Sequence, residues 1–174
     1  MDITQNTEQL QFPEGPIAMP DGSVILVEIM RGTLSRVMPD GEIQVVAEPG
    51  GGPNGAAMGP DGHCYICNNG GFEWSRSSRG LIFPGIQASD YSTGRIEKIN
   101  VETGVVEKLY ADCDGEPLKG PNDIVFDKEG GFWFTDHGKN RARDRDRTGV
   151  YYATVDGQHI VEAIFPMEAP NGIG

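Results

Sequence analysis

The sequence predicts an all-β protein. The expected fold is a β-propeller of four-stranded blades, of which the chain contains about three blades and the start of a fourth out of an expected six. A short opening that contains proline recurs at Pro13, Pro53, Pro121 and Pro170. These openings lie 40, 68 and 49 residues apart, and propeller blades typically repeat every ~40–50 residues. Short apolar runs alternate with turn sequences, and 25 of the 174 residues are glycine. Many tight turns, and no convincing amphipathic helix, are therefore expected.

The first blade, about residues 13–50, shows the pattern in full. Its four strands are expected at residues 16–19, 24–29, 33–37 and 43–47. Asp21-Gly22 and Asp40-Gly41 separate apolar runs, which is a hairpin signal because glycine tolerates the positive φ that such turns require. Residues 24–29 are almost all apolar and do not alternate with polar residues. This strand is therefore expected to be covered on both faces by neighbouring blades.

The second and third blades follow the same order, at about residues 51–118 and 119–168, and residues 169–174 begin the next blade. Strands of the second blade are expected at residues 55–58, 63–67, 95–100 and 105–110, and those of the third at residues 124–126, 132–135, 150–154 and 159–165. Extra length lies between the second and third strand of each, at residues 68–94 and 137–149. Because strands alternate in direction, these loops emerge at the same end as the openings. Function is expected at that end, over the central channel.

Composition narrows the range of partners. The formal net charge is −12, from 26 acidic and 14 basic residues, and such a surface repels nucleic acid and anionic membranes. The sequence has no apolar run of ~18 residues, and its first dozen residues do not resemble a signal peptide. We expect a cytoplasmic protein with a small-molecule substrate, no nucleic-acid partner and no membrane partner. The sequence does not predict its oligomeric state. The alternating Arg and Asp of residues 141–147 indicate a self-paired, solvated loop.

The cysteines indicate packing and not metal binding. Cys64, Cys67 and Cys113 are an odd number, which fits a reducing compartment better than a disulfide framework. Cys64 and Cys67 have the spacing of a CxxC motif, but they lie in an expected strand, where residues three apart point to opposite faces. Both are therefore expected to be buried structural residues.

Each opening places a polar residue at the beginning of an innermost strand. These residues are Glu14, Asn54, Asn122 and Asn171, and they converge because innermost strands line the channel. One carboxylate with several amide oxygens is a hard ligand set that suits Ca²⁺, or Mg²⁺ or Mn²⁺ with more water. Asn before Gly is also a common turn residue, so for Asn54 the turn and ligand interpretations stand equal. Glutamate is a poor turn former, which favours a site at Glu14.

Three motifs carry a family resemblance. PEGP at residues 13–16, GPND with GGFWFTD across residues 120–136, and PNGIG at residues 170–174 resemble the SMP-30/gluconolactonase family from about Phe12 onward. The resemblance implies a six-bladed propeller with a catalytic divalent metal in its channel, as in lactonases and diisopropyl-fluorophosphatase. It implies that Glu14, Asn122 and Asn171 bind the metal, most of all Ca²⁺, with Mg²⁺, Mn²⁺ and Zn²⁺ as alternatives.

Other site residues follow from the same resemblance. The second blade usually carries no ligand, so Asn54 is assigned to the substrate pocket. Asp136 and His137 end a strand on the functional side and are candidate substrate contacts. Asp123 is another candidate, although a role in bracing the turn is equally expected. The family's remaining ligand, a blade-five Asp that commonly also acts in catalysis, would lie beyond Gly174. The catalytic residue is therefore unknown, and we expect an N-terminal fragment that is inactive alone.

The resulting function hypothesis is a metal-dependent hydrolase that opens a lactone, a sugar lactone or related ester, through a metal-polarised carbonyl and an activated water. No GxSxG motif or recognisable serine–histidine pattern supports a covalent route. The alternatives are a non-catalytic binding propeller of the NHL kind and a phosphotriester hydrolase with the same metal site. The aromatic residues of the loop at residues 72–91 are expected to form an apolar pocket wall, or alternatively to pack the loop onto its blade.

Overall fold

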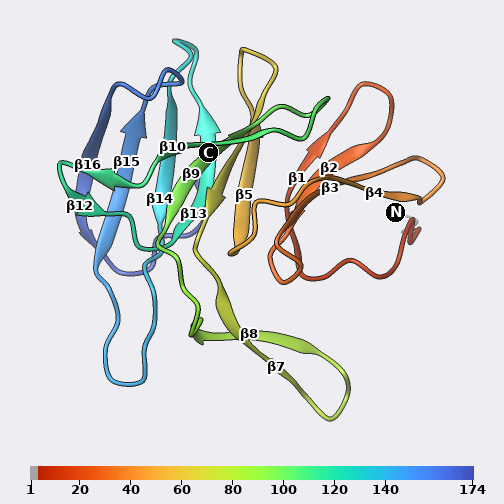
Figure 1. The fold of residues 1–174 in the computed structure, drawn as a ribbon, viewed down its shortest axis with the longest axis horizontal. Coiled ribbons are helices and arrows are strands. Elements are labelled where there is room, and N and C mark those ends of the chain that lie inside the picture. The colour runs from red at the N-terminus through yellow and green to blue at the C-terminus, as the bar shows by residue number, and fades with distance from the viewer. Residues whose placement is uncertain (1–3) are drawn as a thin grey trace.

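The computed structural model describes residues 4–174, which form three four-stranded antiparallel sheets and two small hairpins and contain no helix (Figure 1). The first sheet contains β1 (Pro13–Ala18), β2 (Val24–Glu28), β3 (Thr33–Val37) and β4 (Ile43–Ala47). The second contains β5 (Pro53–Met58), β6 (Cys64–Asn68), β9 (Arg95–Ile99) and β10 (Val106–Tyr110). The third contains β13 (Pro121–Phe126), β14 (Phe132–Asp136), β15 (Thr148–Ala153) and β16 (Ile160–Met167). Within this range no helix could therefore cross a membrane.

The strands of each sheet pair in sequence order, and neighbouring sheets meet along β1, β5 and β13. This is the arrangement of adjacent blades, so the predicted partial β-propeller is confirmed. The innermost strands begin earlier than expected, at the prolines of the openings. Proline is acceptable at the first residue of a strand because it withholds only one N–H group from the ladder.

The core lies between the sheets and not within a single one. In β6, Cys64 and Ile66 pack against the first sheet, whereas Tyr65 and Cys67 pack against the third. All three cysteines are buried and free, and burial raises the pKa of Cys64 to about 12. The central strands are thus covered on both faces, and the expected structural role of Cys64 and Cys67 is confirmed.

Two hairpins were not anticipated from the sequence. One consists of β7 (Phe72–Arg76) and β8 (Ile82–Gln87), and the other of β11 (Asp112–Cys113) and β12 (Glu116–Pro117). The sequence of β8 contains Pro84 and Gly85, which usually argue against a strand. Figure 1 shows β7 and β8 extending from the lower end of the sheets, as does the connection between β14 and β15. The two insertions touch, because the Gln87 N–H donates to the Asn140 carbonyl at 2.8 Å.

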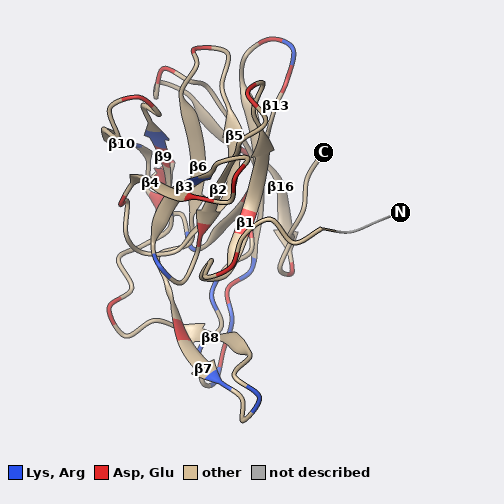
Figure 2. Ribbon diagram, turned by 90° about the vertical axis from the view of Figure 1, so that its right-hand side faces the viewer, with Lys and Arg blue, Asp and Glu red and all other residues tan. Residues whose placement is uncertain are grey.

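Charge in these insertions is locally paired. Arg141 contacts both Asp144 and Asp146, and its guanidinium reaches the Asp146 carboxylate at 2.6 Å. Figure 2 shows this alternation of basic and acidic segments beside the hairpin. The expectation of a self-paired loop is therefore confirmed for Arg141.

Candidate functional site

The three openings share an irregularity in their pairing with the next strand. The register shifts between Glu14 and Ile17 in the first sheet, between Pro53 and Ala56 in the second, and between Pro121 and Ile124 in the third. Bulges re-aim side chains and often lie beside functional sites. The same local device therefore directs the polar residue after each proline.

Two glycines allow the innermost strands to approach closely. A Cβ atom on Gly15 would lie 2.6 Å from the Ala56 nitrogen, and one on Gly55 would lie 2.5 Å from the Asn122 carbonyl oxygen. Both distances are too short for any side chain. Glycine after Glu14 and after Asn54 thus permits the contacts between β1, β5 and β13 that bring the openings together.

A buried polar residue supports each opening from the adjacent strand. Glu28, Asn68 and Asp136 are paired with the opening prolines Pro13, Pro53 and Pro121, and all three are fully buried. We call them the braces. Each brace side chain accepts an N–H bond from the segment before its opening, namely from Gln11 at 2.7 Å, Gly52 at 2.9 Å and Gly120 at 2.8 Å. Glu28 and Asn68 were not predicted from the sequence, since this repeat appears only once the strands are paired.

The Asp136 carboxylate accepts more backbone N–H bonds than the side chain of either other brace. Its carboxylate also accepts N–H bonds from Lys119 and Gly138, each at 2.8 Å. Burial raises the pKa of this carboxyl, and the three N–H bonds act in the opposite direction. Asp136 does not line the cavity described below. The geometry therefore shows Asp136 holding the opening, and the expected substrate contact stays a prediction.

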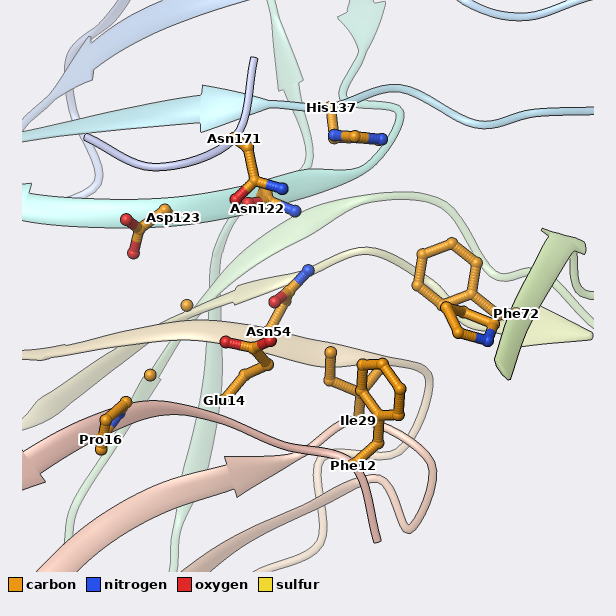
Figure 3. Close-up of a pocket in the computed structure, with 13 residues that line it drawn as sticks. Phe12, Glu14, Pro16, Ile29, Asn54, Phe72, Asn122, Asp123, His137 and Asn171 are labelled. Carbon is orange, nitrogen blue, oxygen red and sulfur yellow. The ribbon is translucent and has the colours of Figure 1, made fainter. Parts of the chain in front are cut away.

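A cavity of about 410 Å³ lies where the openings converge. Figure 3 shows Glu14 facing Asn122 and Asn171, with Asn54 between them. Six of the seven residues singled out from the sequence line this cavity, all except Asp136. The lining is completed by Phe72, by the residues flanking the openings, and by three residues that the sequence did not indicate, Phe12, Ile29 and Pro84.

The polar lining residues differ in how far the protein satisfies them. Within residues 4–174, the side chains of Glu14, Asn54 and Asn122 form no hydrogen bond to another residue, although Asn122 is only 9% exposed. Asp123 is engaged, because its carboxylate accepts the Ile124 N–H at 2.9 Å and the Ile173 N–H at 3.1 Å. Asp123 therefore holds the segment that carries Asn171 against β13.

His137 follows the Asp136 brace and lines the cavity. Its Nδ1 atom is buried and has no partner among the described residues. Burial lowers the pKa of the imidazole, and the nearby Arg145 charge lowers it further. Both effects favour the neutral imidazole, which can accept or donate a hydrogen bond at the cavity wall.

The donor chemistry of the cavity fits a hard cation. Residues 4–174 bring together no group of three His, Cys, Asp or Glu side chains that could hold a metal. The cavity instead combines the Glu14 carboxylate with the amide oxygens of Asn122 and Asn171. Oxygen ligands of this kind are those that Ca²⁺ and Mg²⁺ prefer.

Comparison with known proteins places these features in a family. The model of the SMP-30/gluconolactonase/LRE-like region matches residues 12–174. A gluconolactonase from Zymomonas mobilis is 23% identical over 94% of this chain and 46% of its own length. The lactonase drp35 of Staphylococcus aureus is 27% identical over 87% of this chain and 41% of its own length. The chain thus spans about half the length of the curated relatives it matches.

Solved structures show the same fold. The structure of a gluconolactonase from Xanthomonas campestris superposes with a TM-score of 0.67 at 19% identity. The match covers 94% of this chain and 50% of that one. At this identity the likeness concerns the arrangement of the blades.

Proposed function

Because the chain belongs to the SMP-30/gluconolactonase/LRE-like family, we propose that the protein it represents is a divalent-metal-dependent hydrolase that opens lactones. The names of the relatives support the reaction class. The observation that carries the proposal is the set of convergent oxygen donors, Glu14, Asn122 and Asn171, around one cavity.

Each of these residues has a defined part in the proposal. Glu14 supplies the anionic oxygen that attracts a divalent cation, most of all Ca²⁺, and Asn122 and Asn171 supply neutral amide oxygens. When bound, the cation polarises a carbonyl oxygen and lowers the pKa of a water molecule. Because the side chains of Glu14 and Asn122 form no hydrogen bond to another described residue, they can take a ligand without breaking a bond within the protein.

The remaining polar residues bind and orient the substrate. Neutral His137 offers a hydrogen bond to a ring or carbonyl oxygen, and Asn54 offers an amide from the second sheet. Asp123 positions Asn171 through the Ile173 N–H. The braces keep the openings in place, so the donors are ordered before a ligand arrives.

The test is hydrolysis of lactones by the full-length gene product. We expect turnover with added Ca²⁺, loss of turnover on chelation, and recovery when Ca²⁺ is restored. Glu14→Gln keeps the size of the side chain and removes its charge, so it should abolish most of this turnover while the melting temperature without metal stays unchanged. Metal-independent turnover, or full activity of Glu14→Gln, would contradict the proposal.

A further inference from the structure

One side of the cavity is built from hydrocarbon. Phe12, Ile29, Phe72 and Pro84 line it, and we call these four residues the apolar wall. Figure 3 shows Phe12, Ile29 and Phe72 on one side of the cavity, with Glu14 and the asparagines on the other. A molecule whose reacting group met the polar donors would therefore place another part of itself against this wall.

The apolar wall joins the first sheet to the β7–β8 hairpin. The Phe12 ring lies 5.2 Å from the Trp74 ring, which in turn meets the Phe72 ring edge-on at 6.1 Å. Phe12 has a φ of 60°, which is uncommon for a bulky residue, and the Ile29 N–H holds its carbonyl at 3.0 Å. Strained conformations of this kind persist where the surroundings hold them, often at functional sites.

Phe72 is also fixed from behind by a buried lysine. The Lys139 Nζ lies 3.8 Å from the centre of the Phe72 ring and donates to the Gly71 carbonyl at 2.6 Å. Lys139 is only 1% exposed. The Gln87–Asn140 bond ties the other strand of the hairpin to the same loop. The position of the wall relative to the polar donors is therefore set by the fold and not by a mobile loop.

From this placement we infer that the preferred substrate is a lactone or ester with an alkyl or aryl substituent, which lies against the apolar wall. The inference rests on the proposed function and specifies its substrate class. A hydroxyl group on that side of the ring would lose water and find no partner among the four wall residues. An apolar group of the same size would gain contact, and each added methylene in such a pocket contributes about tenfold or more to kcat/KM.

The experiment compares two lactones of one ring size with the full-length protein and Ca²⁺, one carrying an alkyl or aryl chain and one carrying several hydroxyl groups. We expect the higher kcat/KM for the apolar lactone. Phe72→Ser should lower that value by about tenfold or more and leave the polyhydroxylated lactone within about twofold. Phe72→Leu, which keeps the hydrocarbon, should retain most of the preference.

Phe83→Ser is the matched control. Phe83 lies on the same hairpin, is 48% exposed and does not line the cavity, so both kcat/KM values should stay unchanged. A wild-type preference for the polyhydroxylated lactone, or an equal loss for both lactones in Phe72→Ser alone, would overturn the inference and leave lactone hydrolysis standing. A full-length protein that opens no lactone would overturn the proposed function, and the inference with it.

Discussion

The two ends of the sheets use similar polar residues in opposite ways. At the turn end, Asp21, Asp61 and Asp127 each accept an N–H bond from their own turn, from Ser23 at 3.0 Å, His63 at 3.2 Å and Glu129 at 3.0 Å. At the cavity end, the side chains of Glu14, Asn54 and Asn122 have no such bond within residues 4–174. Aspartate side chains thus close turns at one end, whereas carboxylate and amide side chains remain available at the other.

The difference shows that, at the cavity end, one set of residues holds the backbone and another set is available to bind a ligand. The bonds that local turn residues make at the turn end are made here by the braces, which lie buried on the adjacent strands. The polar side chains of the openings are therefore not needed to hold their own backbone. A different prediction follows for each group of residues. Substitution of a brace should lower the free energy of unfolding, whereas substitution of a polar residue in an opening should weaken ligand binding.

The largest expected effect is on the Asp136 brace. Asp136→Ala leaves three N–H groups, those of Lys119, Gly120 and Gly138, without their acceptor. We expect the free energy of unfolding to fall by about 4 kcal/mol. Asp156→Ala in the same sheet is the control, since Asp156 bonds only to its own turn. Urea denaturation of both variants measures the difference, and equal losses would remove the distinction between the two ends.

Lys139, at the cavity end, should make the free energy of unfolding depend on pH. Burial lowers the pKa of Lys139 to about 8, although Asp136 and Asp146 act against this shift. Between pH 8 and 10.5 the unfolded chain keeps the proton that the folded chain has lost, so stability rises with pH. Relative to Lys139→Met, wild type should gain roughly 3 kcal/mol over this window.

The control for this measurement is Lys98, at the turn end. A hydrogen bond to Asp61 raises the pKa of Lys98 above 10.5. Its contribution to stability is therefore nearly constant up to pH 10.5 and is lost only as the pH rises further, so it gives no increase over this window. Denaturation curves at pH 7.5 and pH 10.5 separate the two. If wild type and Lys139→Met change in parallel over this range, Lys139 is not the buried cation that anchors Phe72.

The smallest effect is expected at the turn end itself. Burial alone would raise the pKa of Asp61, but hydrogen bonds from Lys98, His63 and Tyr65 lower it to about 2. The resulting stability is present above pH 4 and is lost as the pH falls toward 2. Asp61→Asn should therefore lower the free energy of unfolding by about 1 kcal/mol at pH 7, because the side chain is partly solvated. At pH 2.5 we expect the variant and wild type to unfold at nearly the same urea concentration, and a constant difference would refute this assignment.

Much of the fold and the polar half of the site follow from local sequence. The Asp-Gly turns and the unbroken apolar run of β2 predict strands in order. The recurrent proline predicts that Glu14, Asn54, Asn122 and Asn171 meet. These features depend on residues that are close in the sequence, and they can therefore be predicted from the sequence alone.

The braces and the apolar wall depend on contacts between residues that are far apart in the sequence. Phe12 meets Trp74, and Lys139 meets Phe72, across two different sheets or loops. The sequence predicted that the adjacent residues Asp136 and His137 both contact the substrate, yet only His137 lines the cavity. Consecutive residues at the end of a strand point to opposite sides, and the side that faces the cavity is decided by the packing of neighbouring blades.

Calcium binding to the full-length protein, measured by titration calorimetry, tests the central claim most directly. Wild type and Asp61→Asn should bind one Ca²⁺ with the same affinity, because Asp61 lies at the turn end. Glu14→Gln should bind about a hundredfold more weakly or not at all, since it removes the only carboxylate among the three proposed ligands. Equal binding by Glu14→Gln and wild type would contradict the assignment of the openings as the metal site.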